Sequence, residues 1–146
     1  MLKEHGLIDL ENVAYTYSGG ELLSEMTLSI ASGAFYFLTG PSGSGKTTFL
    51  KMCYGALVPT TGTITIFGQE PRKITRDDIA LTRRRIGVVH QDCQFLDHLN
   101  VVDNIALPLA AAGQDTLADG ANLKELLNWV GLGHRADALP PELSGG

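Results

Sequence analysis

The sequence Gly40-Pro-Ser-Gly-Ser-Gly-Lys-Thr47 matches the pattern G-x-x-x-x-G-K-[ST] in full. Its glycines allow the backbone to curl so that successive N–H groups point inward at phosphate oxygens. The positive end of a following helix reinforces such a site. The Lys46 ammonium can reach the β- and γ-phosphates of a nucleotide, and the Thr47 hydroxyl can ligate Mg²⁺. The sequence therefore predicts a phosphate-binding loop.

The residues on both sides of this loop have the pattern that a phosphate-binding loop requires. Residues 34–39 form a short, continuous apolar run, which predicts a strand buried on both faces of a parallel sheet. Residues 46–57 have helical character. The order strand, loop, helix argues against the alternative, an ordinary glycine-rich turn before a helix. The candidate ATP-binding residues of the loop are Gly40, Pro41, Ser42, Gly43, Ser44, Gly45, Lys46, Thr47 and Thr48.

The rest of the chain divides into a part rich in strands and a part rich in helices. The expected strands alternate apolar and polar residues or are rich in β-branched residues, and they cover 7–13, 23–30, 63–67 and 86–90. The expected helices cover 77–85, 101–112 and 117–130, and we expect Trp129 in the last of them to be a core residue. This order predicts one domain with two lobes, a β-rich core over residues 1–91 and a helical lobe over residues 92–146.

Composition and charge exclude some classes of function. The 146 residues carry 11 Lys and Arg against 16 Asp and Glu, for a net charge of -5. This acidic balance argues against a nucleic-acid partner, whose binding surface is basic. No apolar stretch approaches the roughly 18 residues that suggest a membrane span. Any association with a membrane is therefore expected to occur through a partner protein.

The two cysteines carry no metal or disulfide pattern. Cys53 and Cys93 lie far apart in the sequence, without CxxC or metal-ligand spacing. We expect both to be reduced thiols in a cytoplasmic protein, because disulfides are rare in that compartment.

Two further motifs gain meaning only from their positions. Gln91 follows the expected strand 86–90, and α/β folds place ligands at the carboxyl ends of strands, although a polar residue at a strand end is also common. Leu143-Ser-Gly-Gly146 lies after the helical part, and on its own it would be read as a flexible turn.

Taken together, these motifs resemble those of ATP-binding-cassette ATPases, in the same order along the chain. The resemblance implies an α/β fold of the P-loop NTPase type. This chain would be the N-terminal part of a nucleotide-binding domain, with an antiparallel β subdomain, a partial parallel core sheet and a helical subdomain. The family works as a head-to-tail dimer that encloses ATP and Mg²⁺, so a homodimer is implied for the parent protein.

The resemblance also implies a role for individual residues. Tyr17 would stack on adenine, and Tyr15 is the weaker candidate for that role. Gln91 would contact Mg²⁺ or the attacking water, so that Lys46 and Gln91 are the catalytic residues in this chain and Thr47 and Gln91 the Mg²⁺ residues. The signature residues, which would complete the ATP site of the opposite subunit, are Leu143, Ser144, Gly145 and Gly146.

Within the family, the chain is most similar to FtsE-type cell-division ATPases. The similarity lies in Gln91-Asp92, Leu96-Asp-His-Leu99 and residues 103–109. It implies an integral membrane partner of the FtsX type and a location on the cytoplasmic face of the membrane. Residues 91–109 would then face that partner, with Phe95 and Leu96 filling a groove that receives a short helix, unless these side chains pack inside the helical lobe.

Three alternatives remain open at this stage. Lipoprotein-releasing and macrolide-exporter ATPases share the layout but usually lack the acidic residue after the glutamine. A soluble family member that acts on DNA is disfavoured by the acidic charge and by the short spacing between Gln91 and Leu143. The third is a phosphate-loop enzyme of another family, such as a small-molecule kinase.

The catalytic carboxylates of the family have no counterpart in this sequence. The family continues past the signature to a strand that ends in Asp-Glu, and no run of four apolar residues followed by Asp-Glu occurs here. The glutamate is the family's general base, which positions the attacking water. We therefore expect the C-terminal catalytic part to be absent, and these 146 residues to bind ATP at best.

Overall fold

The computed structural model describes residues 6–18, 20–91, 94–113 and 120–143. The chain forms two compact units, Met1–Gly87 and Val88–Gly146. Each unit is described by itself.

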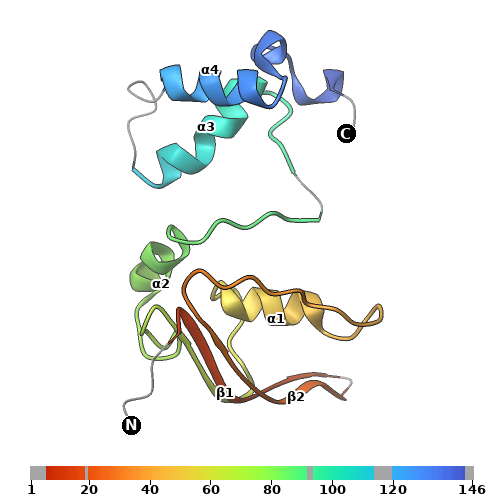
Figure 1. Cartoon of the computed structure of the whole chain (residues 1–146), viewed down its shortest axis with the longest axis vertical. Coiled ribbons are helices and arrows are strands. Elements are labelled where there is room, and N and C mark those ends of the chain that lie inside the picture. Colours follow the sequence, from red (N-terminus) through yellow and green to blue (C-terminus); the bar gives the residue numbers. More distant parts are fainter. Residues whose placement is uncertain (1–5, 19, 92–93, 114–119, 144–146) are drawn as a thin grey trace. The chain divides into compact units, whose positions relative to one another are not determined.

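The first unit contains an antiparallel sheet of three strands in the order β2-β1-β3. Figure 1 labels β1 and β2. The strands are β1 (Ile8–Tyr17), β2 (Gly20–Ile30) and β3 (Thr61–Ile66). β1 is the central strand and pairs antiparallel with both neighbours. The antiparallel β subdomain expected from the alternating pattern is therefore confirmed, with strands that begin earlier or end later than the sequence suggested.

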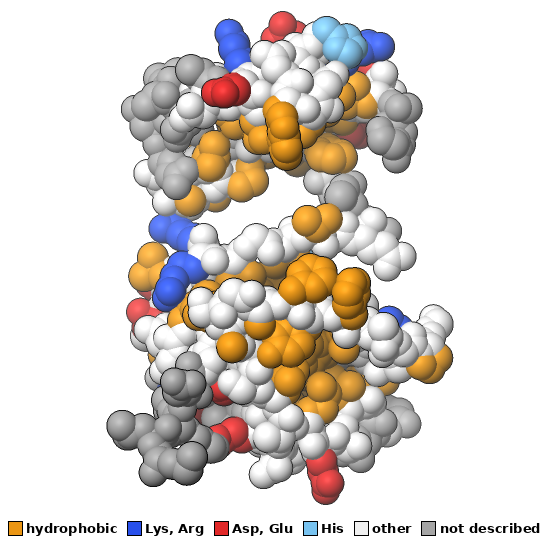
Figure 2. Space-filling model, in the orientation of Figure 1, with side chains coloured by type: hydrophobic (Ala, Val, Ile, Leu, Met, Phe, Trp, Pro, Cys, Tyr) orange, Lys and Arg blue, Asp and Glu red, His pale blue; other side chains and the backbone are white. Residues whose placement is uncertain are grey.

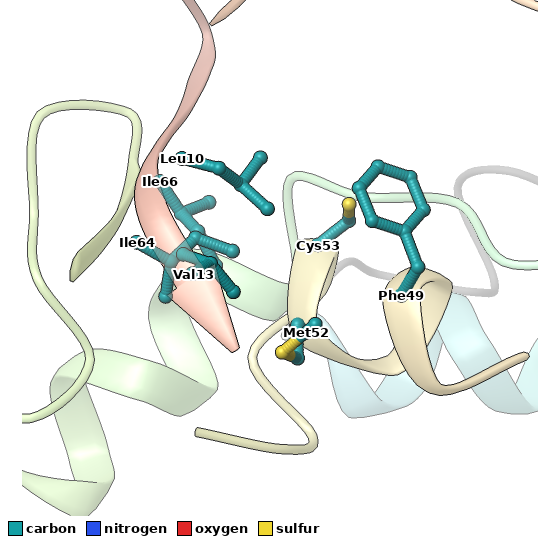
Figure 3. Close-up of a cluster of buried hydrophobic side chains, with 7 residues drawn as sticks. All are labelled: Leu10, Val13, Phe49, Met52, Cys53, Ile64 and Ile66. Atoms are coloured by element: carbon teal, nitrogen blue, oxygen red, sulfur yellow. The ribbon is translucent and has the colours of Figure 1, made fainter. Parts of the chain in front are cut away.

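One face of this sheet packs against helix α1 (Lys46–Cys53), which follows the glycine-rich loop. The buried side chains of the sheet and of the helix face one another (Figure 3), and they are Leu10, Val13, Ile64, Ile66, Phe49, Met52 and Cys53. Burial of a large apolar side chain stabilises a fold by about 1.5–3 kcal/mol. The sheet therefore anchors α1 and, through it, the loop at its N-terminus. Burial also raises the pKa of the Cys53 thiol to about 12.

Helix α2 (Arg76–Arg83) is capped at its start and attached at its end. Thr75 and Asp78 form a reciprocal capping box, and the hydrogen bonds from the Thr75 hydroxyl and backbone N–H lower the pKa of Asp78. At the other end, the Arg83 guanidinium donates to the Gly55 carbonyl at 2.6 Å. These contacts hold α2 beside the turn that follows α1.

Two segments that we expected to be core strands are irregular in the structure. Within the described residues, segments 34–39 and 86–90 pair with no strand. A continuous apolar run forms a strand only where a neighbouring strand satisfies its N–H and C=O groups. Without such a neighbour the side chains stay exposed, at 80% for Phe35 and 85% for Phe37. Apolar side chains are accordingly visible on the surface of this unit (Figure 2).

The second unit consists of helices. α3 (Val101–Ala111) and α4 (Gly120–Trp129) are followed by the short 3-10 helices Gly133–Arg135 and Pro140–Glu142. The expected helical lobe is therefore present. The expectation that Trp129 is a core residue is wrong: it is the last residue of α4 and is 83% exposed, because α4 turns Leu123 and Leu127 inward instead.

None of the helices in the part of the chain that the structure describes has the length and apolar composition needed to cross a bilayer.

Candidate nucleotide-binding site

The glycine-rich loop curls through backbone conformations that only glycine adopts easily. Gly43 and Gly45 have φ angles of 80° and 86°, in the left-handed region. A Cβ atom at Gly45 would lie 2.7 Å from Leu23 Cδ2, so the loop also packs too closely against β2 for a side chain. The two glycines therefore allow the loop to turn directly into α1.

Lys46, the first residue of α1, holds the loop closed. Its ammonium group donates to the Gly40 carbonyl at 2.8 Å and to the Pro41 carbonyl at 2.7 Å. The Ser44 hydroxyl lies at 3.5 Å, at the limit of a hydrogen bond. An ammonium has three N–H donors, and the two carbonyls engage two of them. The third donor reaches only the Ser44 hydroxyl, at this long distance, so that donor and the positive charge are suited to a phosphate oxygen.

The first turn of α1 supplies further donors. The Phe49 N–H donates to the Gly45 carbonyl at 2.8 Å and begins the helical hydrogen bonds. The N–H groups of the helical residues before Phe49 therefore have no carbonyl within the helix to bind. Such amides, at the positive end of the helix dipole, form an anion site. The loop thus fits the phosphates of a nucleotide.

The two threonines after Lys46 differ in burial. Thr47 is exposed, so its hydroxyl is available as an oxygen ligand of the kind that Mg²⁺ takes. Thr48 is buried, as is Phe49. The Thr48 side chain is therefore less accessible to a ligand than that of Thr47, and its contact with ATP stays a prediction.

The candidate adenine-stacking residues lie next to each other at the end of β1. The rings of Tyr15 and Tyr17 meet edge to face, with centroids 4.9 Å apart. Tyr17 is 49% exposed, whereas Tyr15 packs partly against the core. Desolvation, together with the neighbouring Tyr17, raises the pKa of Tyr15. The greater exposure of Tyr17 favours it over Tyr15 for stacking on a base, and that role stays a prediction.

The other predicted site residues lie in the second unit. Gln91 is exposed, and Leu143 is half-buried at the end of the second 3-10 helix. Ser144, Gly145 and Gly146 lie outside the described residues. The structure thus brings together residues 40–48. The roles of Gln91 and of the signature residues stay predictions.

The sequence analysis missed the residues that support the loop from behind. Leu22 and Leu23, at the start of β2, approach the position of a Cβ on Gly45. This contact joins segments far apart in the chain, so no local sequence pattern predicts it. The only sequence sign is a pair of apolar residues where strict alternation would place one.

Comparison with known proteins identifies the family. Residues 23–146 match the ABC transporter family. The chain is 37% identical over 141 residues to the cell division ATP-binding protein FtsE of Bacillus subtilis, covering 96% of this chain and 62% of that protein. It is 39% identical over 133 residues to the lipoprotein-releasing system ATP-binding protein LolD 1 of Rhodopirellula baltica, covering 88% of this chain and 58% of that protein.

A solved structure with the same fold is the dimeric, post-hydrolysis state of the ATP-binding cassette MJ0796 bound to ADP and Pi. It matches with a TM-score of 0.83 and 30% identity, over 94% of this chain and 63% of that chain. The chain therefore spans somewhat less than two thirds of the length of these relatives. The match confirms the expected fold class, although segments 34–39 and 86–90 form no ladder among the described residues. The chain belongs to the ABC transporter family, with the fold of its ATP-binding cassette.

Proposed function

We propose that residues 40–48 are the phosphate site of an ATPase whose ATP binding and hydrolysis drive changes in an integral membrane partner. The observation that carries this proposal is the position of the Lys46 ammonium, held over the loop by the Gly40 and Pro41 carbonyls with only a long third contact, to the Ser44 hydroxyl at 3.5 Å. The related cassette MJ0796 is bound to ADP and Pi, which supports an adenine nucleotide as the ligand.

The residues of this chain bind and orient ATP rather than break its phosphate bond. Lys46 and the amides at the start of α1 would hold the phosphates, and Tyr17 would stack on the base. Bound Mg²⁺ neutralises charge on the phosphates, and the Thr47 hydroxyl and Gln91 are the groups proposed to hold it. Because the sequence offers no Asp-Glu pair of the family's type, we propose that residues 1–146 bind nucleotide without useful turnover.

The membrane partner would contact the loop that follows Gln91. Phe95 and Leu96 are 59% and 44% exposed, so the alternative that they pack inside the helical lobe is not favoured. Two neighbouring exposed apolar side chains fit a short apolar helix of a partner protein. The parent protein would then lie on the cytoplasmic face of the membrane through that partner.

Among the family's branches, we propose the FtsE-type cell-division branch, with an FtsX-like partner. The FtsE relative aligns over 96% of this chain and the LolD relative over 88%, although the LolD identity is slightly higher. Asp92 directly after Gln91 also favours the FtsE branch. The second candidate is a lipoprotein-releasing transporter ATPase, favoured by that 39% identity.

The dimeric MJ0796 cassette supports a homodimer for the parent protein. In that arrangement the signature residues 143–146 of one subunit would complete the ATP site of the other. ATP would then close the dimer and pass the change to the membrane partner.

The test of the phosphate site is Lys46→Ala in the full-length protein. Hydrogen bonds to a charged group contribute about 1.5–3 kcal/mol, so ATP affinity is expected to fall by about 10- to 100-fold. The matched control is Lys51→Ala, which removes an exposed lysine from the last turn of the same helix. Titration with a fluorescent ATP analogue measures both. Equal affinities for the two variants would show that the loop is not the phosphate site.

The branch is tested by the membrane protein that co-purifies with the full-length chain from its own cells. A four-span protein with one large extracytoplasmic loop is expected. Recovery of a lipoprotein-sorting complex instead would select the LolD-type alternative.

A further inference from the structure

The side chain of Asn104, in the first half of α3, makes four hydrogen bonds to one short loop. Its Oδ1 accepts from the Leu96 N–H at 2.8 Å. Its Nδ2 donates to the carbonyls of Leu96, Leu99 and Asn100 at 3.1, 2.9 and 3.0 Å. One side chain thus fixes the backbone of residues 96–100 at both ends.

Only a carboxamide of this length can make this set of bonds. The NH₂ group has two N–H donors, which three carbonyl oxygens share, and the amide oxygen accepts at the same time. A carboxylate in the same place would accept from the Leu96 N–H but would face the three carbonyl oxygens with its own negative charge. Alanine would make none of the four bonds. The substitutions Asn104→Asp and Asn104→Ala therefore separate the accepting function from the donating one.

The same part of α3 is bonded to the segment that precedes Leu143. The first two helical amides, of Val101 and Val102, donate to the carbonyls of Ala138 and Ala136 at 2.9 and 3.0 Å. Val101 is also buried. The loop, the start of α3 and residues 136–138 therefore form one hydrogen-bonded unit, with Asn104 as the link to the loop.

We propose that Asn104 is a positioning residue for the membrane partner. It fixes the backbone of residues 96–100 in a conformation that leaves Phe95 and Leu96 exposed, and it links this loop through the start of α3 to residues 136–138. Asn104 is half-buried, is not part of the nucleotide loop, and acts through the backbone that it fixes. This inference rests on the proposed function, because it assumes that the exposed apolar pair receives a partner.

Loss of a positioning residue lowers partner-dependent activity, whereas loss of a purely structural residue lowers the stability of the fold. The two bonds to Leu96 are exposed, so water can bind the Leu96 groups that Asn104 releases, whereas the bonds to the Leu99 and Asn100 carbonyls are part-buried. The unfolding midpoint should then fall only modestly, while the loop gains alternative conformations. Partner-dependent activity falls because only a fraction of molecules present the loop correctly.

The experiment uses the full-length protein in nanodiscs with the membrane protein that co-purifies with the wild type. For both Asn104 variants, we expect partner-stimulated kcat to fall about tenfold, within the range of measured couplings between sites, and the KM for ATP to stay unchanged. Hydrogen exchange should show the Leu96 amide unprotected in Asn104→Ala but still protected in Asn104→Asp. Partner-stimulated kcat should fall in both variants, because both lose the three hydrogen bonds that the Asn104 Nδ2 group donates.

The matched control is Asn100→Ala on the same helix. The Asn100 side chain caps α3 by accepting from the Asp103 N–H at 2.8 Å, so its removal weakens the helix start and leaves the Asn104 bonds in place. Stimulation should persist in this control. Equal loss in Asn100→Ala and Asn104→Ala would overturn the proposal in favour of a general structural effect.

A Phe95→Asp variant separates failure of the inference from failure of the proposed function. If Phe95→Asp abolishes stimulation and Asn104→Ala does not, the positioning role is wrong and the docking surface stands. If no membrane protein co-purifies with the wild type, the proposed function fails and the positioning role fails with it.

Discussion

Strand β1 and segment 34–39 are both rich in apolar residues, and they end in opposite environments. In β1, Leu10 and Val13 are almost completely buried, and the strand has a partner on each side. In segment 34–39, Phe35 and Phe37 are among the most exposed large hydrophobic side chains of the described residues. An apolar sequence is thus sufficient to favour a strand but not to form one.

The difference comes from how many faces of each segment are apolar and must be buried. β1 alternates, so one face packs on α1 and the other tolerates water. The run 34–39 is apolar on both faces and needs a strand beside it and cover on each side. β1 obtains one ladder partner, β2, from the segment that follows it directly, and the other, β3, from beyond α1. The described residues offer none to segment 34–39.

The largest effect is expected at the buried face of β1, which is tightly packed. Leu10→Ala in the full-length protein should lower the free energy of unfolding by about 2–5 kcal/mol, because it removes a fully buried side chain and leaves a cavity. Urea denaturation monitored by circular dichroism measures this. A loss below about 1 kcal/mol, typical of a surface position, would contradict the burial of β1.

The second prediction concerns Phe37→Ser in the 146-residue chain. Exposed apolar side chains beside unpaired backbone favour aggregation, so these residues alone should be poorly soluble. The serine variant should aggregate several-fold more slowly, as followed by light scattering. In a longer chain that supplies a neighbouring strand, the ring would be buried, and the same substitution should instead destabilise the fold. If both chains respond equally, segment 34–39 has the same surroundings in each.

The smallest effect is expected in a labelling experiment at neutral to mildly alkaline pH. Burial raises the pKa of Cys53 from 9.0 to about 12, so the reactive thiolate is scarce in the folded state. In a Cys93→Ser background, iodoacetamide should modify Cys53 only on unfolding. A cysteine at the exposed position Tyr36, introduced in a variant that also lacks Cys53, should react at once.

The same burial has a consequence for pH dependence. The folded state favours the neutral thiol, so the stabilisation from Cys53 is complete below the unfolded pKa of 9.0. It is lost as the pH rises from there toward about 12. The melting temperatures of the wild type and of Cys53→Ala should therefore depend differently on pH in this range. Identical pH dependence of the two proteins would show that the thiol is not buried.

The phosphate loop could be predicted from sequence because its chemistry is local. The left-handed turns at Gly43 and Gly45, the Lys46 contacts with Gly40 and Pro41, and the amides of the first helical turn all lie within one short stretch of chain. The alternation that predicts the β1 and β2 strands is equally local. Each of these features depends only on residues within the same short stretch of sequence.

Features that join distant segments depended on the tertiary structure. Whether the apolar run 34–39 becomes a strand depends on a neighbour that its own residues cannot specify, and the inward face of α4 left Trp129 exposed. The support of Gly45 by Leu23 and the bonds from α3 to residues 136–138 likewise join parts of the chain that lie far apart in sequence. The backbone conformation of a turn or helix start depends on nearby residues. Burial and strand pairing also require segments from elsewhere in the chain to pack alongside.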